Sequence, residues 1–166
     1  MNIRGNSVSI RPIDHRDLDF VLGVYRQCED FLALGPEPRA SIGMVYGDIQ
    51  LSIDEGGNYC GVFDFQDRLI GVVDFILSQK GNPGHAFISL LMIALTYRRK
   101  GVGSEAVRLV EYEISKDPQI TSIDSAVQIN NLDAIRFWEK HGYQIVSEPV
   151  SQPDHTTVYH LCKKIR

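Results

Sequence analysis

The sequence predicts an α/β fold made of a single domain, in which a mixed, mostly antiparallel central sheet is flanked by helices. Three observations lead to this prediction. The chain has 166 residues, of which 43% are apolar, and this is enough for one hydrophobic core. Segments with apolar residues at helical spacing alternate with β-rich runs, and two of these runs lie close enough to form a hairpin. No repeat, linker or low-complexity tract divides the chain, so we expect residues 1–166 to form one domain.

The N-terminal part predicts one strand and two helices. Residues 7–13 alternate in polarity as a short strand does, and Asp14 and Asp17 can cap the helix that follows. The Gly-Pro-Glu-Pro run at 35–38 ends that helix, and a second helix is expected from Ser41 to about Ile53. The apolar residues of the first helix that fall at helical spacing are Leu18, Val21, Leu22, Tyr25, Cys28 and Leu32.

The middle of the chain predicts three strands. Residues 59–65 and 69–77 are rich in β-branched and aromatic residues and lie three residues apart, as in a β-hairpin. Residues 86–95 follow a Gly-Asn-Pro-Gly turn and are apolar almost throughout. A strand without alternation is typically covered on both faces, so we expect this strand to be central.

The C-terminal part alternates helices and strands. A helix is expected after Gly101, a strand over 120–127, and a second helix that Asn131 can cap and Gly142 can close. Two final strands are expected over 143–146 and 156–165. The whole order describes an antiparallel meander that runs into a strand–helix–strand unit, with helices packed on a mixed sheet.

Composition excludes several classes of function. The formal net charge is −4, so the basic excess typical of a nucleic-acid partner is absent. Three widely spaced cysteines without a CxxC pair indicate neither a disulfide framework nor a metal site. The N-terminus lacks a secretory signal and no run is long enough to span a membrane. We expect a soluble, cytoplasmic protein, and a homodimer is compatible with the sequence.

The most informative segment is Arg98-Arg99-Lys100-Gly101-Val102-Gly103-Ser104, between the central strand and a helix. Two glycines let the backbone turn tightly and approach a ligand closely, and side chains at Gly101 or Gly103 would obstruct that approach. The first N–H groups of the helix form a site for phosphate oxygens, and three consecutive cations add charge for a polyphosphate ligand.

Two other kinds of phosphate-binding motif are also rich in glycine. The nucleotide-triphosphate P-loop string is absent. Residues 101–106 do fit the Gly-x-Gly-x-x-Ala dinucleotide pattern, and Asp124 lies about twenty residues further on, where a ribose-binding acid is expected. However, the glycines do not follow their strand directly, and the motif lies past the middle of the chain. We therefore expect no dinucleotide to bind.

At these residues the chain resembles the GNAT superfamily of N-acetyltransferases. Arg98, Gly101 and Gly103 match the family's Arg/Gln-x-x-Gly-x-Gly/Ala signature. Residues 131–143 are similar to its second signature, Asn-x-x-Ala-x-x-Phe-Tyr-x-x-x-Gly-Phe. The resemblance follows the order of elements over the whole chain and is strongest from about Ala86 to Tyr143.

The resemblance implies that acetyl-coenzyme A donates an acetyl group to a primary amine of a small molecule or a peptide. Backbone N–H groups from Arg99 to Ser104 would bind the pyrophosphate. The N–H of Ile93 would polarise the thioester carbonyl as an oxyanion-hole donor does. The implied donor-site residues are Met92 and Ile93 on the central strand, Arg98, Arg99, Lys100, Gly101, Val102, Gly103 and Ser104 in the turn, and Asn131, Ala134, Phe137 and Trp138 across the cleft. For Phe137 itself, plain core packing is the favoured interpretation.

The catalytic acid and base are not fixed by this resemblance. The family often has a tyrosine where this chain has Trp138, and an indole N–H cannot supply a proton near neutral pH. Tyr143, Ser125 or water is then left to protonate the departing thiolate. The candidates for the general base are Asp74, His85 and Ser89, with His85 expected at an exposed turn.

Acceptor contacts are expected from residues 31–46. This stretch predicts a small amphipathic amine rather than a strongly anionic polyamine site. The alternative function is a domain of the same fold that senses acyl-CoA without turnover.

Overall fold

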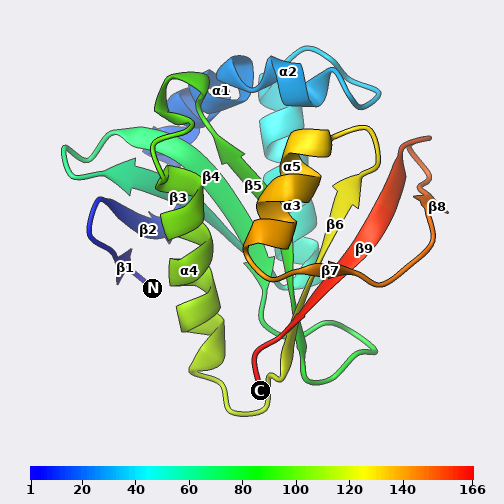
Figure 1. Cartoon of the computed structure of the whole chain (residues 1–166). Helices are drawn as coiled ribbons and strands as arrows, with labels where there is room; N and C mark the ends of the chain where they lie inside the picture. Colours follow the sequence, from blue (N-terminus) through cyan, green and yellow to red (C-terminus); the bar gives the residue numbers. More distant parts are fainter.

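The computed structural model describes residues 1–166 and has one nine-stranded sheet at its centre (Figure 1). The strand order is β1-β2-β3-β4-β5-β6-β9-β7, with β8 paired to β9. Only β5 and β6 run parallel, and every other pair is antiparallel. The strands are β1 (Ile3–Arg4), β2 (Val8–Pro12), β3 (Asn58–Asp64), β4 (Leu69–Ile76), β5 (His85–Ile93), β6 (Ser122–Gln128), β7 (Gln144–Ile145), β8 (Val150–Ser151) and β9 (Thr157–Lys164).

Helices cover both faces of this sheet. On one face, the helices α4 and α5 enclose the larger core, which includes Ile88, Val110 and Leu161. On the other face, α1 and α3 pack on β3, β4 and the upper end of β5. The helical segments are η1 (His15–Asp17), α1 (Leu18–Gln27), α2 (Glu29–Leu32), α3 (Ile42–Glu55), η2 (Leu95–Tyr97), α4 (Val102–Ser115) and α5 (Leu132–Lys140).

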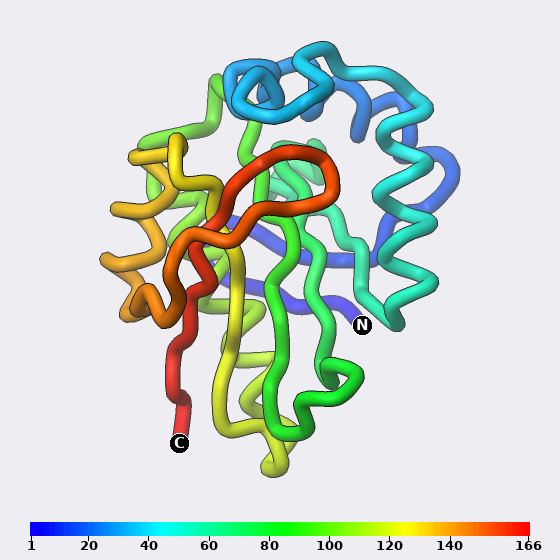
Figure 2. Tube along the Cα trace, turned by 90° about the vertical axis from the view of Figure 1, so that its right-hand side faces the viewer, coloured from blue at the N-terminus to red at the C-terminus, as the bar shows by residue number.

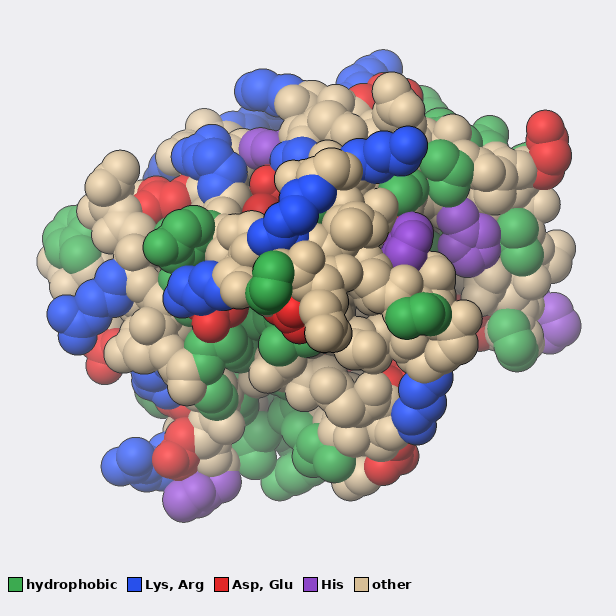
Figure 3. All heavy atoms as spheres, turned by 90° about the horizontal axis from the view of Figure 1, so that it is seen from below, with side chains coloured by type: hydrophobic (Ala, Val, Ile, Leu, Met, Phe, Trp, Pro, Cys, Tyr) green, Lys and Arg blue, Asp and Glu red, His purple; other side chains and the backbone are tan.

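The sheet is left partly uncovered on the second face. In Figure 2 the lower parts of β5, β6 and β9 run side by side with no helix in front of them. The space-filling view from below shows Lys and Arg interspersed with Asp and Glu rather than gathered into a patch of one sign (Figure 3). No helix is both long and apolar enough to cross a membrane.

The central strand β5 carries a bulge that changes which face its side chains point to. Phe75 pairs with Ile88 and Asp74 pairs with Leu90, so Ser89 has no partner in the register. A bulge inserts one residue and reverses the alternation of faces beyond it. Leu91 and Ile93 therefore contact the same core as Ile88, whereas Leu90 and Met92 belong to the core under α1 and α3.

The fold class predicted from the sequence is confirmed, and the order of its main elements is as predicted. Two expectations need correction. The first helix is broken at Cys28, whose φ of −109° and ψ of 18° are not helical, although Cys28 keeps its place on the buried side. The strand β5 is central but is not covered on both faces, because Ser89 is exposed and Phe87 is half-buried. The short strands β1 and β8 were not expected.

Candidate functional site

An opening between β5 and β6 is the main feature of the upper half of the sheet. Their parallel pairing ends at Ile88 and Ser125, after which β5 continues beside β4 and β6 continues beside β9. The Ser125 hydroxyl donates to the Ile88 carbonyl at 2.8 Å at the point where the strands part. The bulge at Ser89 and the separation of β5 from β6 therefore begin three to four residues before Met92. Met92 and Ile93 lie in the part of β5 that no longer pairs with β6.

Backbone groups of Leu91 and Ile93 line this opening. The Ala94 N–H donates to the Ile70 carbonyl at 2.9 Å, so the backbone groups of residues 92 and 94 face β4. Those of residues 91 and 93 then face the other way, because backbone groups alternate along an antiparallel pair. The Ile93 carbonyl accepts from Arg98 Nε at 2.8 Å and from Cys28 Sγ at 3.4 Å. The Ile93 N–H is left facing the opening.

The Arg98 guanidinium serves the protein framework, which revises its expected role. Besides its bond to Ile93, it pairs with both carboxylate oxygens of Asp30, at 2.6 and 3.1 Å. A charge-assisted bidentate pair of this kind fixes a side chain firmly. Arg98 therefore joins the turn, the end of β5 and α2, and its charge is already neutralised.

The turn after η2 presents unpaired backbone donors. Gly101 has φ +79° and precedes α4, and the first N–H there to find an acceptor is that of Glu105, which donates to the Gly101 carbonyl at 2.9 Å. The N–H groups of residues 101–104 are available to an anion. Arg99 and Lys100 are exposed beside them, and Lys100 Nζ donates to the Thr96 carbonyl.

Gly103 lies where α4, α5 and β5 come together. A Cβ atom built there would lie 3.5 Å from Phe137 and 3.6 Å from Ile93, which is ordinary van der Waals contact. At Gly103, therefore, only a side chain larger than that of alanine is expected to obstruct the approach of a ligand. Next to it, the Ser104 hydroxyl lies 3.0 Å from His141 Nε2, and burial lowers the pKa of His141.

Helix α5 carries two aromatic residues, and both pack on the larger core. Phe137 is half-buried and is the ring next to Gly103, on the side of the turn. Trp138 is only 6% exposed and packs edge-on against Tyr143 in the core, with ring centroids 4.8 Å apart. Asn131 accepts from the Ala134 N–H at 3.1 Å and so caps the helix, as predicted.

Asp74 and Ser89, two candidates for the general base, belong to one hydrogen-bonded cluster in which Asp74 is buried and Ser89 is exposed. Asp74 is 7% exposed, and its two carboxylate oxygens accept from the Ser52 and Ser89 hydroxyls at 2.6 Å each. Ser89 is the bulged residue of β5, so this cluster holds the bulge against α3. With both oxygens engaged, Asp74 is poorly placed to take a proton from a substrate.

The two remaining sequence candidates lie away from the opening. His85 starts β5, roughly 25 Å from Ile93 at about 3.3 Å per residue. It is half-buried rather than exposed as expected, because its Nδ1 lies 2.9 Å from Asp124 Oδ2. Tyr143 is buried and donates to Glu111 at 3.0 Å. Burial, with the Glu111 charge beside it, raises the pKa of Tyr143 far above its ordinary value.

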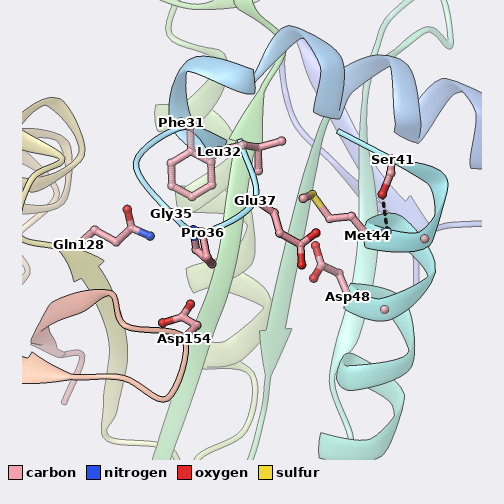
Figure 4. A pocket seen from close by; sticks show the side chains of 12 residues that line it. Phe31, Leu32, Gly35, Pro36, Glu37, Ser41, Met44, Asp48, Gln128 and Asp154 are labelled. Atoms are coloured by element: carbon pink, nitrogen blue, oxygen red, sulfur yellow. Dashed lines mark hydrogen bonds between the residues drawn. The ribbon is translucent and has the colours of Figure 1, made fainter. Parts of the chain in front are cut away.

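A cavity of about 570 Å³ lies beside the opening, above the face that carries α3 (Figure 4). Gln128, the last residue of β6, lines one side of it, and the 31–37 segment and α3 line the others. Three carboxylates line the cavity: Glu37, Asp48 and Asp154. Figure 4 shows Glu37 and Asp48 pointing toward one another, with Asp154 below them. None of the three pairs with Lys or Arg.

Asp48 is the most enclosed of these three carboxylates. It accepts from the Tyr25 hydroxyl at 2.6 Å, and Tyr25 lies 2.7 Å from the Tyr59 hydroxyl below it. Burial raises the pKa of Asp48, and the negative charges of Asp74 and Glu37 add to this effect, although the Tyr25 hydrogen bond opposes it. A carboxylate of raised pKa lining a cavity is suited to accept a proton.

The anionic cavity corrects one expectation from the sequence. Residues 31–46 contain Glu37 and Arg39, which suggested balanced charge. In the structure Arg39 instead pairs with Glu29 outside the cavity, at 3.4 Å. Asp48 lies just beyond the stretch considered and Asp154 lies in the β8–β9 loop. Only the fold brings these acids together.

Comparisons with known proteins agree with this geometry. A sequence model described as the acetyltransferase (GNAT) family matches residues 25–143. The chain is similar to the probable N-acetyltransferase YjcK of Bacillus subtilis, with 28% identity over 150 residues that cover 85% of this chain and 82% of that one. It is also similar to the probable N-acetyltransferase san of Drosophila melanogaster, with 32% identity over 92 residues. That match covers 55% of this chain and half of the Drosophila protein.

Solved structures share the fold at low sequence identity. An acetyltransferase from Thermus thermophilus superposes with a TM-score of 0.78 at 19% identity, covering 99% of this chain and 100% of that one. The spermidine N-acetyltransferase of Vibrio cholerae, solved with CoA and spermine, gives 0.74 at 18% identity, with 95% of each chain covered. The enzyme AAC(6′)-Ib, solved with ribostamycin and coenzyme A, gives 0.77 at 21% identity, covering 96% and 94%.

Proposed function

The chain belongs to the acetyltransferase (GNAT) family, and we propose that it transfers the acetyl group of acetyl-coenzyme A directly to a primary amine of a small molecule or a peptide. The observation that carries the proposal is the opening between β5 and β6, which has the inward-facing N–H of Ile93 beside it and the turn at 101–104 nearby. In the reaction the amine nitrogen attacks the thioester carbon, the C–N bond forms, the C–S bond breaks, and the coenzyme A thiolate leaves.

The donor side of the site is mostly backbone. The N–H groups of Gly101, Val102, Gly103 and Ser104 are the proposed donors to the pyrophosphate, with Arg99 and Lys100 adding positive charge. The N–H of Ile93 faces the opening, where it can stabilise negative charge that develops on the thioester oxygen. Leu91 and Ile93 supply the strand edge for the pantetheine arm, whereas the backbone of Met92 faces β4. The Phe137 ring borders the turn.

The acceptor side supports a cationic amine. Glu37 and Asp154 are exposed at the cavity and Asp48 is half-buried, so a substrate ammonium group meets negative charge without a competing cation. The V. cholerae relative was solved with the polyamine spermine and AAC(6′)-Ib with ribostamycin, and the chain is also similar to an aminoglycoside N(6′)-acetyltransferase of Klebsiella pneumoniae. These relatives support an acceptor that carries more than one amine.

Asp48 is the residue that we assign as the proton acceptor. It lines the cavity, has a raised pKa, and can pass the proton to solvent through the open side. Asp74, His85, Ser89, Ser125 and Tyr143 are each hydrogen-bonded within the protein, and Trp138 is in the core. No side chain is therefore proposed as the acid, and the thiolate takes its proton from water.

The experiment is a thiol-release screen of the purified chain with acetyl-CoA. The acceptors are a polyamine, an aminoglycoside, a peptide with a free N-terminus and a neutral-tailed monoamine. We expect the two polycations to be acetylated at least tenfold faster than the monoamine at equal concentration. Asp154→Asn should raise KM for the polycation about three- to tenfold with little change for the monoamine, and the exposed Glu139→Gln on α5 is the matched control.

One other function is favoured by a specific observation. The candidate catalytic side chains named from the sequence, Asp74, His85, Ser89, Ser125 and Tyr143, all have hydrogen-bond partners within the protein. This arrangement would suit a domain that senses acyl-CoA without turnover. Saturable acetyl-CoA binding with no thiol release from any amine would establish that function and exclude ours. No acetyl-CoA binding at all would exclude both.

A further inference from the structure

Three side chains with metal-binding atoms meet at the end of the sheet opposite the opening. They are His85 on β5, Asp124 on β6 and Cys162 on β9. A nitrogen, a carboxylate oxygen and a sulfur from these residues all lie within 4.8 Å of one another. All three residues are half-buried. Their chain neighbours Ala86, Ile123 and Leu161 point into the core under α4 and α5, so the three side chains lie on the opposite face of the sheet. They take no part in the proposed acetyl transfer.

The register of the strands explains why these residues meet. Asp124 is the direct cross-strand partner of Cys162 in the antiparallel β6–β9 pair. In the parallel β5–β6 pair, Phe87 is aligned with Asp124, so His85 lies two residues back on the same face. Three neighbouring strands of one sheet therefore hold the cluster, which is a rigid support for ligands.

We propose that His85, Asp124 and Cys162 form a binding site for a divalent transition-metal ion of the zinc class. Imidazole, carboxylate and thiolate together suit zinc, whereas magnesium and calcium prefer oxygen ligands alone. An ion that lies 2.0–2.3 Å from each ligand atom needs those atoms to be about 3.3–3.8 Å apart. His85 Nδ1 lies 2.9 Å from Asp124 Oδ2, and no two of the three ligand atoms are more than 4.8 Å apart. Because the required spacing falls between these two distances, small side-chain rotations would bring all three atoms to the ion.

A neighbouring side chain already steadies the carboxylate. Gln79 Nε2 donates to Asp124 Oδ2 at 3.0 Å and to the Ala86 carbonyl at 3.1 Å. Supporting contacts of this kind orient metal ligands and raise affinity. A tetrahedral ion held by these three side chains would take a water molecule as its fourth ligand. The bound ion ties β9, the last strand, to β6 and β5 at the lower end of the sheet.

The test uses the untagged, chelator-treated chain. Titration with Co²⁺ as an optical probe should give one saturable site with near-ultraviolet thiolate-to-cobalt absorption. Zn²⁺ should displace the cobalt and raise the thermal midpoint by about 3–6 °C when free zinc exceeds Kd tenfold. Cys162→Ser should remove the near-ultraviolet band, and both it and His85→Gln should weaken zinc binding at least tenfold. His160→Ala is the matched control, because His160 is an exposed histidine two residues from Cys162 on the same strand.

Several results would overturn the proposal. One is the absence of zinc binding tighter than about 10 µM in the wild-type chain, which would leave the cluster as a hydrogen-bonded group only. Another is unchanged zinc affinity in folded Cys162→Ser, and a third is loss of binding in His160→Ala, which would place the ion elsewhere. Should either cluster variant fail to fold, the cobalt spectrum of the wild-type chain still decides, since a spectrum without thiolate absorption excludes Cys162 as a ligand. None of these outcomes depends on acetyltransferase activity.

Discussion

Removing the Asp74 carboxylate should cost stability and leave the chemistry of acetyl transfer largely intact. Asp74 accepts hydrogen bonds from the Ser52 and Ser89 hydroxyls, both at 2.6 Å, and hydrogen bonds to a charged group contribute about 1.5–3 kcal/mol each. In Asp74→Ala the buried Ser52 hydroxyl loses its partner, whereas the exposed Ser89 can turn to water. Because removing the buried charge also relieves a desolvation cost, we expect a net loss of about 2–4 kcal/mol.

Urea unfolding, with m-values compared between variants, measures this loss. Asp74→Asn is the conservative variant, because the amide oxygen can accept from one serine while the amide NH₂ donates to the other, and it should cost about 1 kcal/mol. Thiol release by Asp74→Asn should stay within tenfold of the wild type. If Asp74→Ala kept its stability within about 0.5 kcal/mol while Asp74→Asn lost turnover by a hundredfold or more, Asp74 would be the base and our assignment of Asp48 would be wrong.

Three further predictions concern the donor turn, the core and the base. Calorimetry should show that Gly103→Val weakens acetyl-CoA binding at least tenfold, about 1.4 kcal/mol, whereas Gly103→Ala, whose Cβ meets only ordinary contacts, changes it little. Trp138→Ala should lower the free energy of unfolding by about 3–5 kcal/mol, and Trp138→Phe should keep turnover within tenfold; loss of turnover in stable Trp138→Phe would give the indole a chemical role. Burial raises the pKa of Asp48, so the folded state favours the protonated carboxyl. The free energy of unfolding that this group contributes is therefore complete below about pH 4 and is lost as the pH rises through the raised pKa of the folded state. Asp48→Asn should therefore be as stable as wild type or more so near neutral pH, yet lose turnover by about a hundredfold; full activity would rule Asp48 out as the base.

The turn and helix cap of the proposed donor side could be predicted from the sequence, because their signals are local. The glycines at 101 and 103 act through their own backbone, and Asn131 caps the helix that follows it directly. The β-hairpin and the helical spacing of apolar residues are likewise set by residues close together in the sequence. These features do not depend on how distant segments meet.

The proposed acceptor cavity could not be predicted, because segments distant in the sequence build it. Glu37, Asp48 and Asp154 come from a loop, a helix and a second loop, and each alone looks like an ordinary surface acid. The bulge at Ser89 also has no sequence signal, since the residues around it form an unbroken apolar run. The bulge turns Leu91 and Ile93 towards the core under α4 and α5. This can be seen only from the register of β5 with β4.

The backbone lining of the opening between β5 and β6 has a consequence for how such a protein can change over evolutionary time. A main-chain N–H survives almost any replacement of its own side chain, so recognition of the donor tolerates sequence drift as long as the chain keeps its path. The cavity beside it is lined by side chains from a loop, a helix and a second loop, where single replacements alter charge without moving the sheet. If the proposed function holds, selection can thus change acceptor preference one residue at a time while the backbone that binds the donor is kept.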